Sequence, residues 1–264
     1  MKKQNKLIIK IQRLLKKLNQ REYLHHFGPK KYKLQQHLFA LLFMQICKLS
    51  FRRVSEILEQ IGFVVPTYSA LCKSRKRISP SLFEKLLNQT NQEIPKNVAI
   101  DSTGISMQNP SFHFVKRINS KKPVKRFAKL SVFYDIDNRK FLAIKTRAKP
   151  RHDVMDFPSL FKRINNFKNF YGDSAYDSEK IHEACFDRKI QTFIKPRKNV
   201  KRGFHRRKQM KNYSEETYHQ RSLVETGFSV LKRKYGSYTL AKSARAVKAE
   251  LYLRAIACNL NLRC

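Results

Sequence analysis

The stretch FAKLSVFYDIDNRKFLAIKTRA, residues 127–148, decides the fold class of this chain. Apolar and polar residues alternate on both sides of DIDN (135–138), which is the pattern of two strands joined by a tight turn. A third apolar run, NVAI (97–100), comes before the hairpin and leads directly into Asp101. We therefore expect three neighbouring antiparallel strands in the middle of the chain.

Helices and strands alternate after this hairpin. The sequence predicts strands in FKNFYGDSAY (167–176) and QTFIK (191–195), and helices at about 153–166, 178–188, 215–234 and 243–262. Strands interleaved with helices indicate an α/β fold with a mixed sheet flanked by helices. We assign residues 91–264 to this domain.

Residues 1–90 are expected to form a separate, all-helical and basic region. Residues 1–33 contain eleven Lys and Arg and a single acid, with Leu and Ile at helical spacing, which predicts a basic amphipathic helix. A strongly apolar helix is predicted at about 34–48. Capping residues and a Gly-containing turn then delimit two short helices over about 51–78, the outline of a helix-turn-helix.

The second of these short helices carries Lys73, Arg75 and Arg77, and we expect their side chains to contact DNA. The motif has no spacing-specific chemistry, so the alternative is a pair of packed helices with a solvated basic face.

The charge balance points to a polyanionic partner. The chain of 264 residues has 57 Lys and Arg against 19 Asp and Glu, a net charge of +38. Such a charge supplies sequence-independent affinity for phosphate. Nucleic acid is the expected partner, although composition alone also fits a very soluble protein or a ribosomal-type RNA binder. The loop between Asp187 and Glu215 has eleven Lys and Arg and no acid, and it is interpreted as a clamp on a phosphate backbone or as a disordered loop.

Neither a disulfide framework nor a membrane segment is predicted. The five cysteines are widely spaced without a C-x-x-C, which favours a reducing cytoplasm. The apolar run LFALLFMQIC (38–47) is about half the length that a bilayer requires. The N-terminus lacks the features of an export signal.

The helix YHQRSLVETGFSVLKRKYG (218–236) separates polar and apolar residues onto opposite faces. At about 100° per residue, Tyr218, Arg221, Glu225 and Lys232 share one arc, and the apolar residues occupy the other side. Arg221 and Glu225 are four residues apart, so the alternative is a surface ion pair worth a few tenths of a kcal/mol.

Two other acids make a reactive role for Glu225 plausible. Asp101 ends one predicted strand, and Asp173 lies where another predicted strand turns. Carboxylates that converge from strand edges and a helix supply the hard oxygen ligands that Mg²⁺ or Mn²⁺ prefers, and two such ions can activate an attacking oxygen at a phosphodiester. Taken singly, Asp101 and Asp173 also fit ordinary turn-forming residues.

With these residues the sequence resembles the DDE-type insertion-sequence transposases that carry a Tyr-(2)-Arg-(3)-Glu-(6)-Lys signature. Tyr218, Arg221, Glu225 and Lys232 match that spacing, while AIDST around Asp101 and GDSAYDS around Asp173 look like the two Asp blocks. The resemblance covers about residues 95–264 and implies a ribonuclease-H-like catalytic domain. It implies that Asp101, Asp173 and Glu225 bind two Mg²⁺ or Mn²⁺ ions, and that Tyr218, Arg221 and Lys232 contact the transposon-end DNA.

The resemblance also implies an activity and its partners. The enzyme would bind terminal inverted repeats through its front helices, cleave the ends and join the 3′-hydroxyls to target DNA, acting as a homodimer on double-stranded DNA in the nucleoid of a prokaryotic cytoplasm. A catalytically silent DNA-binding derivative and a metal-dependent nuclease of the same fold are the alternatives. His152 and Asp153 resemble a lesser block of the family, or else form a surface His beside a helix cap.

Overall fold

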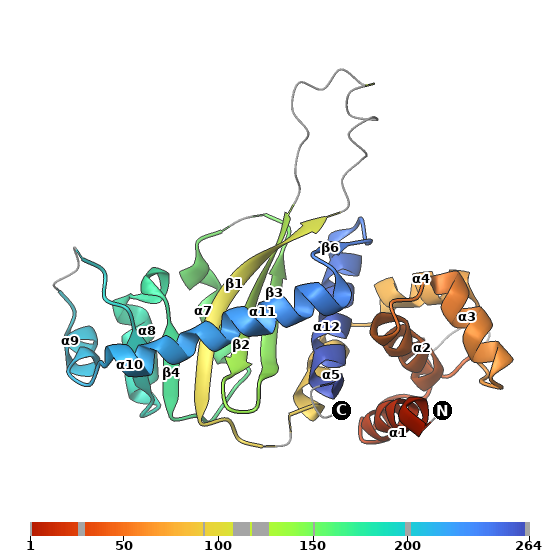
Figure 1. Ribbon diagram of the computed structural model, residues 1–264, viewed down its shortest axis with the longest axis horizontal. Helices are drawn as coiled ribbons and strands as arrows, with labels where there is room; N and C mark the ends of the chain where they lie inside the picture. Colours follow the sequence, from red (N-terminus) through yellow and green to blue (C-terminus); the bar gives the residue numbers. More distant parts are fainter. Residues whose placement is uncertain are drawn as a thin grey trace. The chain divides into compact units, whose positions relative to one another are not determined.

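The computed structural model describes residues 2–25, 30–91, 93–107, 117, 127–149, 151–198 and 202–261. The chain forms two compact units, one of residues 1–92 with 241–264 and the other of residues 93–240 (Figure 1). The sequence-based division falls close to the first boundary. It differs at the C-terminus, because residues 241–264 group with the N-terminal helices.

The first unit is helical. Its elements are α1 (Lys2–Lys16), α2 (Leu34–Ile46), α3 (Phe51–Gln60), α4 (Tyr68–Arg77), α5 (Pro80–Gln89) and α12 (Ala244–Asn261). α12 packs against α2, α4 and α5, and buried residues lie on every side of it, including Leu251 and Ile256. A helix that is buried on nearly every side is enclosed by other helices, which explains why α12 belongs to this unit.

The predicted pair of short helices is present as α3 and α4. Ser50 caps α3, its hydroxyl accepting a hydrogen bond from the Arg53 backbone N–H at 3.2 Å. Gly62 follows the helix with a φ of +82°, the left-handed conformation that glycine adopts without strain. The Ser55 hydroxyl donates to the Pro66 carbonyl at 3.1 Å and fixes the turn between the helices.

The second unit is built on a six-stranded mixed sheet. Its strands are β1 (Asn97–Met107), β2 (Phe127–Asp135), β3 (Lys140–Arg147), β4 (Asn169–Gly172), β5 (Gln191–Ile194) and the short β6 (Tyr238–Thr239). The order is β3-β2-β1-β4-β5, with β6 also paired to β1. β1, β2 and β3 are antiparallel, and β4 and β5 run parallel to β1. The three antiparallel strands and the ribonuclease-H-like mixed sheet predicted from the sequence are confirmed.

Helices cover both faces of this sheet. On one face, α7 (Phe157–Phe161) and α8 (Glu179–Asp187) enclose a core rich in phenylalanine that includes Ile100 and Phe133. Alternate residues of a strand face opposite sides, so Asp101 and Tyr134, the neighbours of Ile100 and Phe133, face the other way. There α11 (Ser222–Tyr235) runs across β1 (Figure 1).

Three predicted segments differ in detail. The helix expected at 215–234 is divided into α10 (Glu215–Tyr218), a 3₁₀ turn (His219–Arg221) and α11. The helix expected at 153–166 is a 3₁₀ turn (Asp153–Asp156) followed by the short α7, because Pro158 fits only the first turn of a helix. Within the basic loop, residues Phe204–Met210 form helix α9.

Candidate active site

Asp101 lies in the middle strand of the sheet, on the face that α11 covers. Its Oδ1 accepts a hydrogen bond from the Ser102 backbone N–H at 2.8 Å, and its side chain is 16% exposed. A carboxylate in this position is largely removed from water and is held by the backbone of its own strand.

Asp173 is carried to the same place by β4. This strand runs parallel to β1 with Tyr171 opposite Ala99 and ends at Gly172, so Asp173 follows it directly and lies near enough to Asp101 for its charge to act on that carboxyl. Asp173 caps the 3₁₀ turn Ser174–Tyr176, and its Oδ1 accepts from the Ala175 backbone N–H at 2.9 Å. The turn-forming role weighed for Asp173 is therefore present, together with its position next to Asp101.

Glu225 reaches the site from the first turn of α11, and Arg221 connects it to Asp101. The guanidinium donates to Glu225 Oε1 at 2.7 Å and to Asp101 Oδ2 at 3.3 Å. The i,i+4 ion pair considered from the sequence is thus formed. It is part of a bridge between two of the three acids, rather than an isolated surface pair.

The pKa of Asp101 reflects first its burial and then the charges around it. Burial raises the pKa of Asp101 to about 6, against the opposing effects of the Ser102 N–H and of Arg221, and the charges of Asp173 and Glu225 raise it further. Burial by itself would lower the pKa of Arg221, but Tyr218, Asp101 and Glu225 together hold it above its usual value. The cluster therefore has an excess of negative charge that a cation would relieve.

The donor set suits a hard divalent cation, but it is not arranged around one. Among the described residues, no group of three or more His, Cys, Asp or Glu side chains is positioned so that it could hold a metal ion. Arg221 lies between Asp101 and Glu225 instead. The Glu225 side chain is 58% exposed, which leaves it free to change rotamer.

The other two residues of the predicted signature lie beside these acids. Lys232 Nζ donates to Thr103 Oγ1 at 2.7 Å, two residues beyond Asp101 on the same face of β1. The Tyr218 ring lies 6.0 Å from the Arg221 guanidinium carbon. The second unit therefore brings together all six residues predicted on the sheet and on the 215–234 segment.

Asp153 belongs to the same neighbourhood, which the sequence left undecided. The Ser102 hydroxyl donates to Asp153 Oδ1 at 2.9 Å, and Lys129 forms an ion pair with Asp153. Ser102 follows Asp101 directly, so Asp153 and Lys129 fix the strand at the residue next to the candidate metal ligand. The resemblance of His152 and Asp153 to a lesser block of the family was the sequence signal for this contact. Nothing in the sequence pointed to Lys129.

Tyr176 is a further residue that sequence reasoning missed. It is fully buried, and its hydroxyl has no hydrogen-bond partner among the described residues. Burial, followed by the charges of Asp153, Asp101 and Asp173, holds the pKa of this phenol far above its usual value. A neutral hydroxyl is thus kept next to the acids.

The three basic residues predicted on α4 have different environments. Lys73 and Arg77 are exposed and line a pocket of the first unit. Arg75 is only 7% exposed, pairs with Glu250 at 3.4 Å and has its guanidinium 4.8 Å from the Phe51 ring. Its contacts place Arg75 in the interior of the unit.

The second unit thus belongs to the class of α/β proteins with a ribonuclease-H-like sheet. It carries three acids near one another, on β1, directly after β4 and on the helix that crosses β1, and these form a candidate phosphoryl-transfer site. The model of the family described as "Transposase DDE domain" matches residues 94–260. The chain belongs to this transposase family.

Two solved structures are distantly similar to the chain. The synaptic complex of piggyBac transposase with hairpin DNA has 13% sequence identity and a TM-score of 0.49, and the match covers 96% of this chain and 70% of that one. The pre-cleavage Mos1 transpososome has 12% identity and a TM-score of 0.26, with 90% and 78% covered. A search of curated proteins gave no match. None of the described helices has the length and hydropathy of a membrane span.

Proposed function

We propose that the protein is an insertion-sequence transposase that binds terminal inverted repeats, cleaves the element's ends and joins their 3′-hydroxyls to target DNA. The convergence of Asp101, Asp173 and Glu225 on one face of the sheet carries this proposal. Membership of the transposase family supports it.

We propose that these three carboxylates together bind two divalent ions, either Mg²⁺ or Mn²⁺. Carboxylate oxygens suit both metals, and Asp173 and Glu225 lie near enough to Asp101 to act on its charge, so a cation would offset the repulsion among them. When bound, the ions would activate the attacking oxygen and neutralise charge on the scissile phosphate.

The chain's own cations would hold the DNA. Lys232, on the same helix as Glu225, would contact a phosphate next to the proposed metal site, and its position beside Thr103 supports this role. Arg221 would exchange its carboxylate partners for a phosphate once divalent ions compete for Asp101 and Glu225. Tyr218, beside Arg221, would contact the same DNA end.

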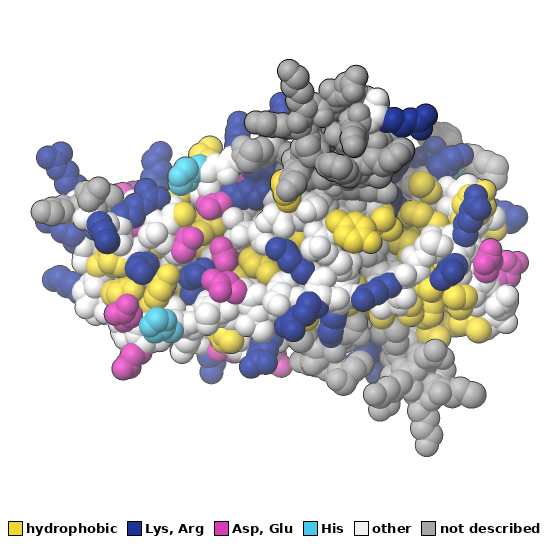
Figure 2. All heavy atoms as spheres, turned by 45° about the horizontal axis from the view of Figure 1, so that its top comes forward, with side chains coloured by type: hydrophobic (Ala, Val, Ile, Leu, Met, Phe, Trp, Pro, Cys, Tyr) yellow, Lys and Arg dark blue, Asp and Glu magenta, His cyan; other side chains and the backbone are white. Residues whose placement is uncertain are grey.

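The chain has many other cations. On the face drawn in Figure 2, the described Lys and Arg side chains are scattered rather than gathered in one patch. Lys73 and Arg77 are the proposed contacts of the first unit, whereas the burial of Arg75 gives it a structural role. A homodimer would hold two DNA ends together, in the nucleoid of a prokaryotic cytoplasm.

A cleavage assay tests the proposal. The substrate is duplex DNA from the regions that flank the coding sequence, with Mg²⁺ or Mn²⁺. We expect wild-type protein to cut at the repeat ends, and Asp101→Asn, Asp173→Asn and Glu225→Gln to bind this DNA without cutting it. Glu216→Gln, an exposed acid on α10, is the matched control and should cut normally. Normal cutting by all three acid variants would contradict the site.

The same assay separates the two alternatives. DNA binding with no metal-dependent nicking by wild-type protein would indicate a silent DNA-binding derivative. Hydrolysis without joined products would indicate a nuclease, because cleavage and strand transfer share one metal site.

A further inference from the structure

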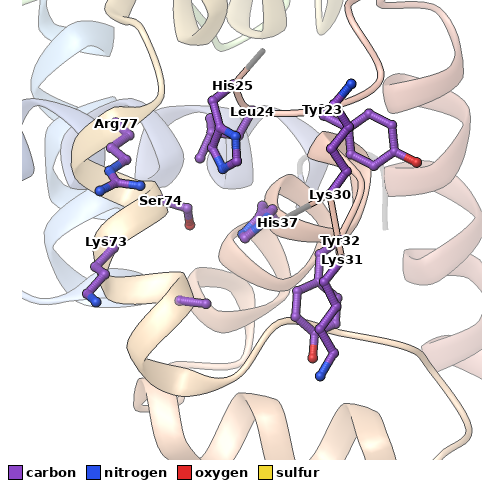
Figure 3. Close-up of a pocket in the computed structure, with 11 residues that line it drawn as sticks. Tyr23, Leu24, His25, Lys30, Lys31, Tyr32, His37, Lys73, Ser74 and Arg77 are labelled. Atoms are coloured by element: carbon purple, nitrogen blue, oxygen red, sulfur yellow. The ribbon is translucent and has the colours of Figure 1, made fainter. Parts of the chain in front are cut away.

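The first unit contains a pocket that the proposed catalytic site does not involve. Its volume is about 180 Å³, and it lies between α4 and the segment that precedes α2 (Figure 3). Lys73 and Arg77 form one wall from α4, and Lys30 and Lys31 belong to the other. In the figure, His37 of α2 lies between these walls.

The described residues that line this pocket include several bases and no acid. Lys30, Lys31, Lys73 and Arg77 make no ion pair with a carboxylate in the part of the chain that the structure describes. The ammonium groups of Lys30 and Lys31 lie instead 5.7 and 5.5 Å from the centres of tyrosine rings. Four cations thus line the pocket, with no acidic side chain among its described lining residues.

His37 adds a buried hydrogen-bonding group. Its side chain is only 7% exposed, and Nδ1 has no hydrogen-bond partner among the described residues. Burial, helped by the charge of His25, lowers the pKa of His37 to about 4, so the imidazole is neutral at pH 7. A neutral imidazole can donate from one ring nitrogen, and a buried donor without a partner is costly.

We propose that this pocket holds one backbone phosphate of duplex DNA. The proposal rests on the proposed function, in which the helical unit binds the ends of the element. Four lining cations, and a buried ring nitrogen of His37 that can donate, fit the charge and the acceptor oxygens of a phosphodiester. Lys73 and Arg77 also lie on the second helix of the helix-turn-helix outline, so the bound phosphate would fix the orientation of that helix on the duplex.

The salt dependence of DNA binding tests the proposal. The slope of log K against log[salt] counts the phosphates that a protein neutralises. The double variant Lys30→Gln/Lys73→Gln removes one cation from each wall and should lower the magnitude of this slope by about one. Lys85→Gln, an exposed lysine of α5 that does not line the pocket, is the control and should keep the wild-type slope.

A second measurement locates the phosphate. Neutral methylphosphonates, placed singly along the duplex, should include one position that weakens wild-type binding but not that of the double variant. If the double variant keeps the wild-type slope of log K against log[salt] and the wild-type pattern of methylphosphonate interference, the pocket does not hold a phosphate. That result would leave the proposed function intact. Failure of the wild-type protein to bind duplex DNA would overturn both, and tighter binding to duplex RNA of the same sequence would overturn the assignment to DNA.

Discussion

Gly227 of α11 packs directly on the ring of Tyr134 in β2. A Cβ at residue 227 would lie 2.7 Å from the Tyr134 ring, closer than a real carbon contact allows. This approach lets α11 lie flat on the sheet, two residues after Glu225. The distance between helix and sheet in turn sets where Glu225 stands relative to Asp101.

We therefore expect Gly227→Ala to reduce both stability and cleavage. Helix propensity alone would stabilise the alanine variant by up to about 1 kcal/mol, whereas overpacking against Tyr134 costs about 1–3 kcal/mol. Denaturant unfolding measures whether the substitution lowers or raises the free energy of unfolding. Thr226→Ala, an exposed neighbour on α11, should leave stability and cleavage near wild type. A stabilised Gly227→Ala protein would contradict the close packing.

Arg221→Gln should strengthen divalent metal binding while impairing cleavage. The guanidinium lies between Asp101 and Glu225, so its removal takes a competing cation from their oxygens. We expect tighter binding of Mn²⁺ by calorimetry and weaker binding of end DNA. The control is Arg233→Gln, at an exposed position of the same helix. Weaker Mn²⁺ binding by Arg221→Gln would show that Arg221 organises the carboxylates instead of competing for them.

Asp153→Asn should weaken catalysis by acting through Ser102. Asp153 accepts the Ser102 hydroxyl at 2.9 Å, and the Ser102 N–H holds Asp101. Loss of a partner that orients a metal ligand costs about 10–100-fold in metal affinity or activity. We expect a higher Mg²⁺ concentration for half-maximal cleavage, with DNA binding unchanged. The double variant Ser102→Ala/Asp153→Asn should cleave no more slowly than either single variant. Additive losses of cleavage would show that Asp153 does not act through Ser102.

Asp177→Asn should destabilise the second unit in a pH-dependent manner. Asp177 is buried and accepts two bonds from Arg206 at 2.8 Å each, and a further contact joins it to His182. Burial alone would raise the pKa of Asp177, but the His182, Arg206 and Arg197 hydrogen bonds hold it well below its ordinary 3.8. The variant leaves Arg206 buried without its partner, which costs about 3–5 kcal/mol.

The sign of the pH dependence follows from the depressed pKa. Stabilisation by Asp177 is complete above pH 3.8 and is lost as the pH falls toward its folded pKa. The difference in unfolding free energy between wild type and Asp177→Asn should therefore be constant near neutral pH and shrink in acid. Denaturant titrations at several pH values measure it, and a difference that stays the same in acid would contradict the ion pair.

Local patterns in the sequence predicted much of the fold. Alternation around residues 135–138 gave the hairpin, and the apolar run before Asp101 gave β1, because strand periodicity is a property of neighbouring residues. The 3.6-residue period gave the buried face of α11, where Val224 and Leu231 are fully enclosed. The mixed sheet followed from the order of these elements.

Contacts between distant residues were beyond such patterns. Arg75 looked like a surface cation because its partner, Glu250, is 175 positions away in the chain. Helix α9 was taken for a loop, since the contact that holds it, between Arg206 and Asp177, joins two segments that sequence spacing does not relate. Arg221 was paired with Glu225 from their spacing, but its bond to Asp101 depends on the packing of α11 against β1.

The place of α12 bears on how the protein is made. Residues 244–261 complete the helical unit, where Glu250 pairs with Arg75 and the Tyr252 hydroxyl donates to Glu84 at 3.0 Å. The N-terminal helices therefore gain this packing partner only when the end of the chain has been made, after the residues that form the sheet. A chain that stops before α12 would leave α2 without this packing partner and Phe83 without the Tyr252 ring that stacks on it, so incomplete translation products should be poor DNA binders and early targets for proteolysis.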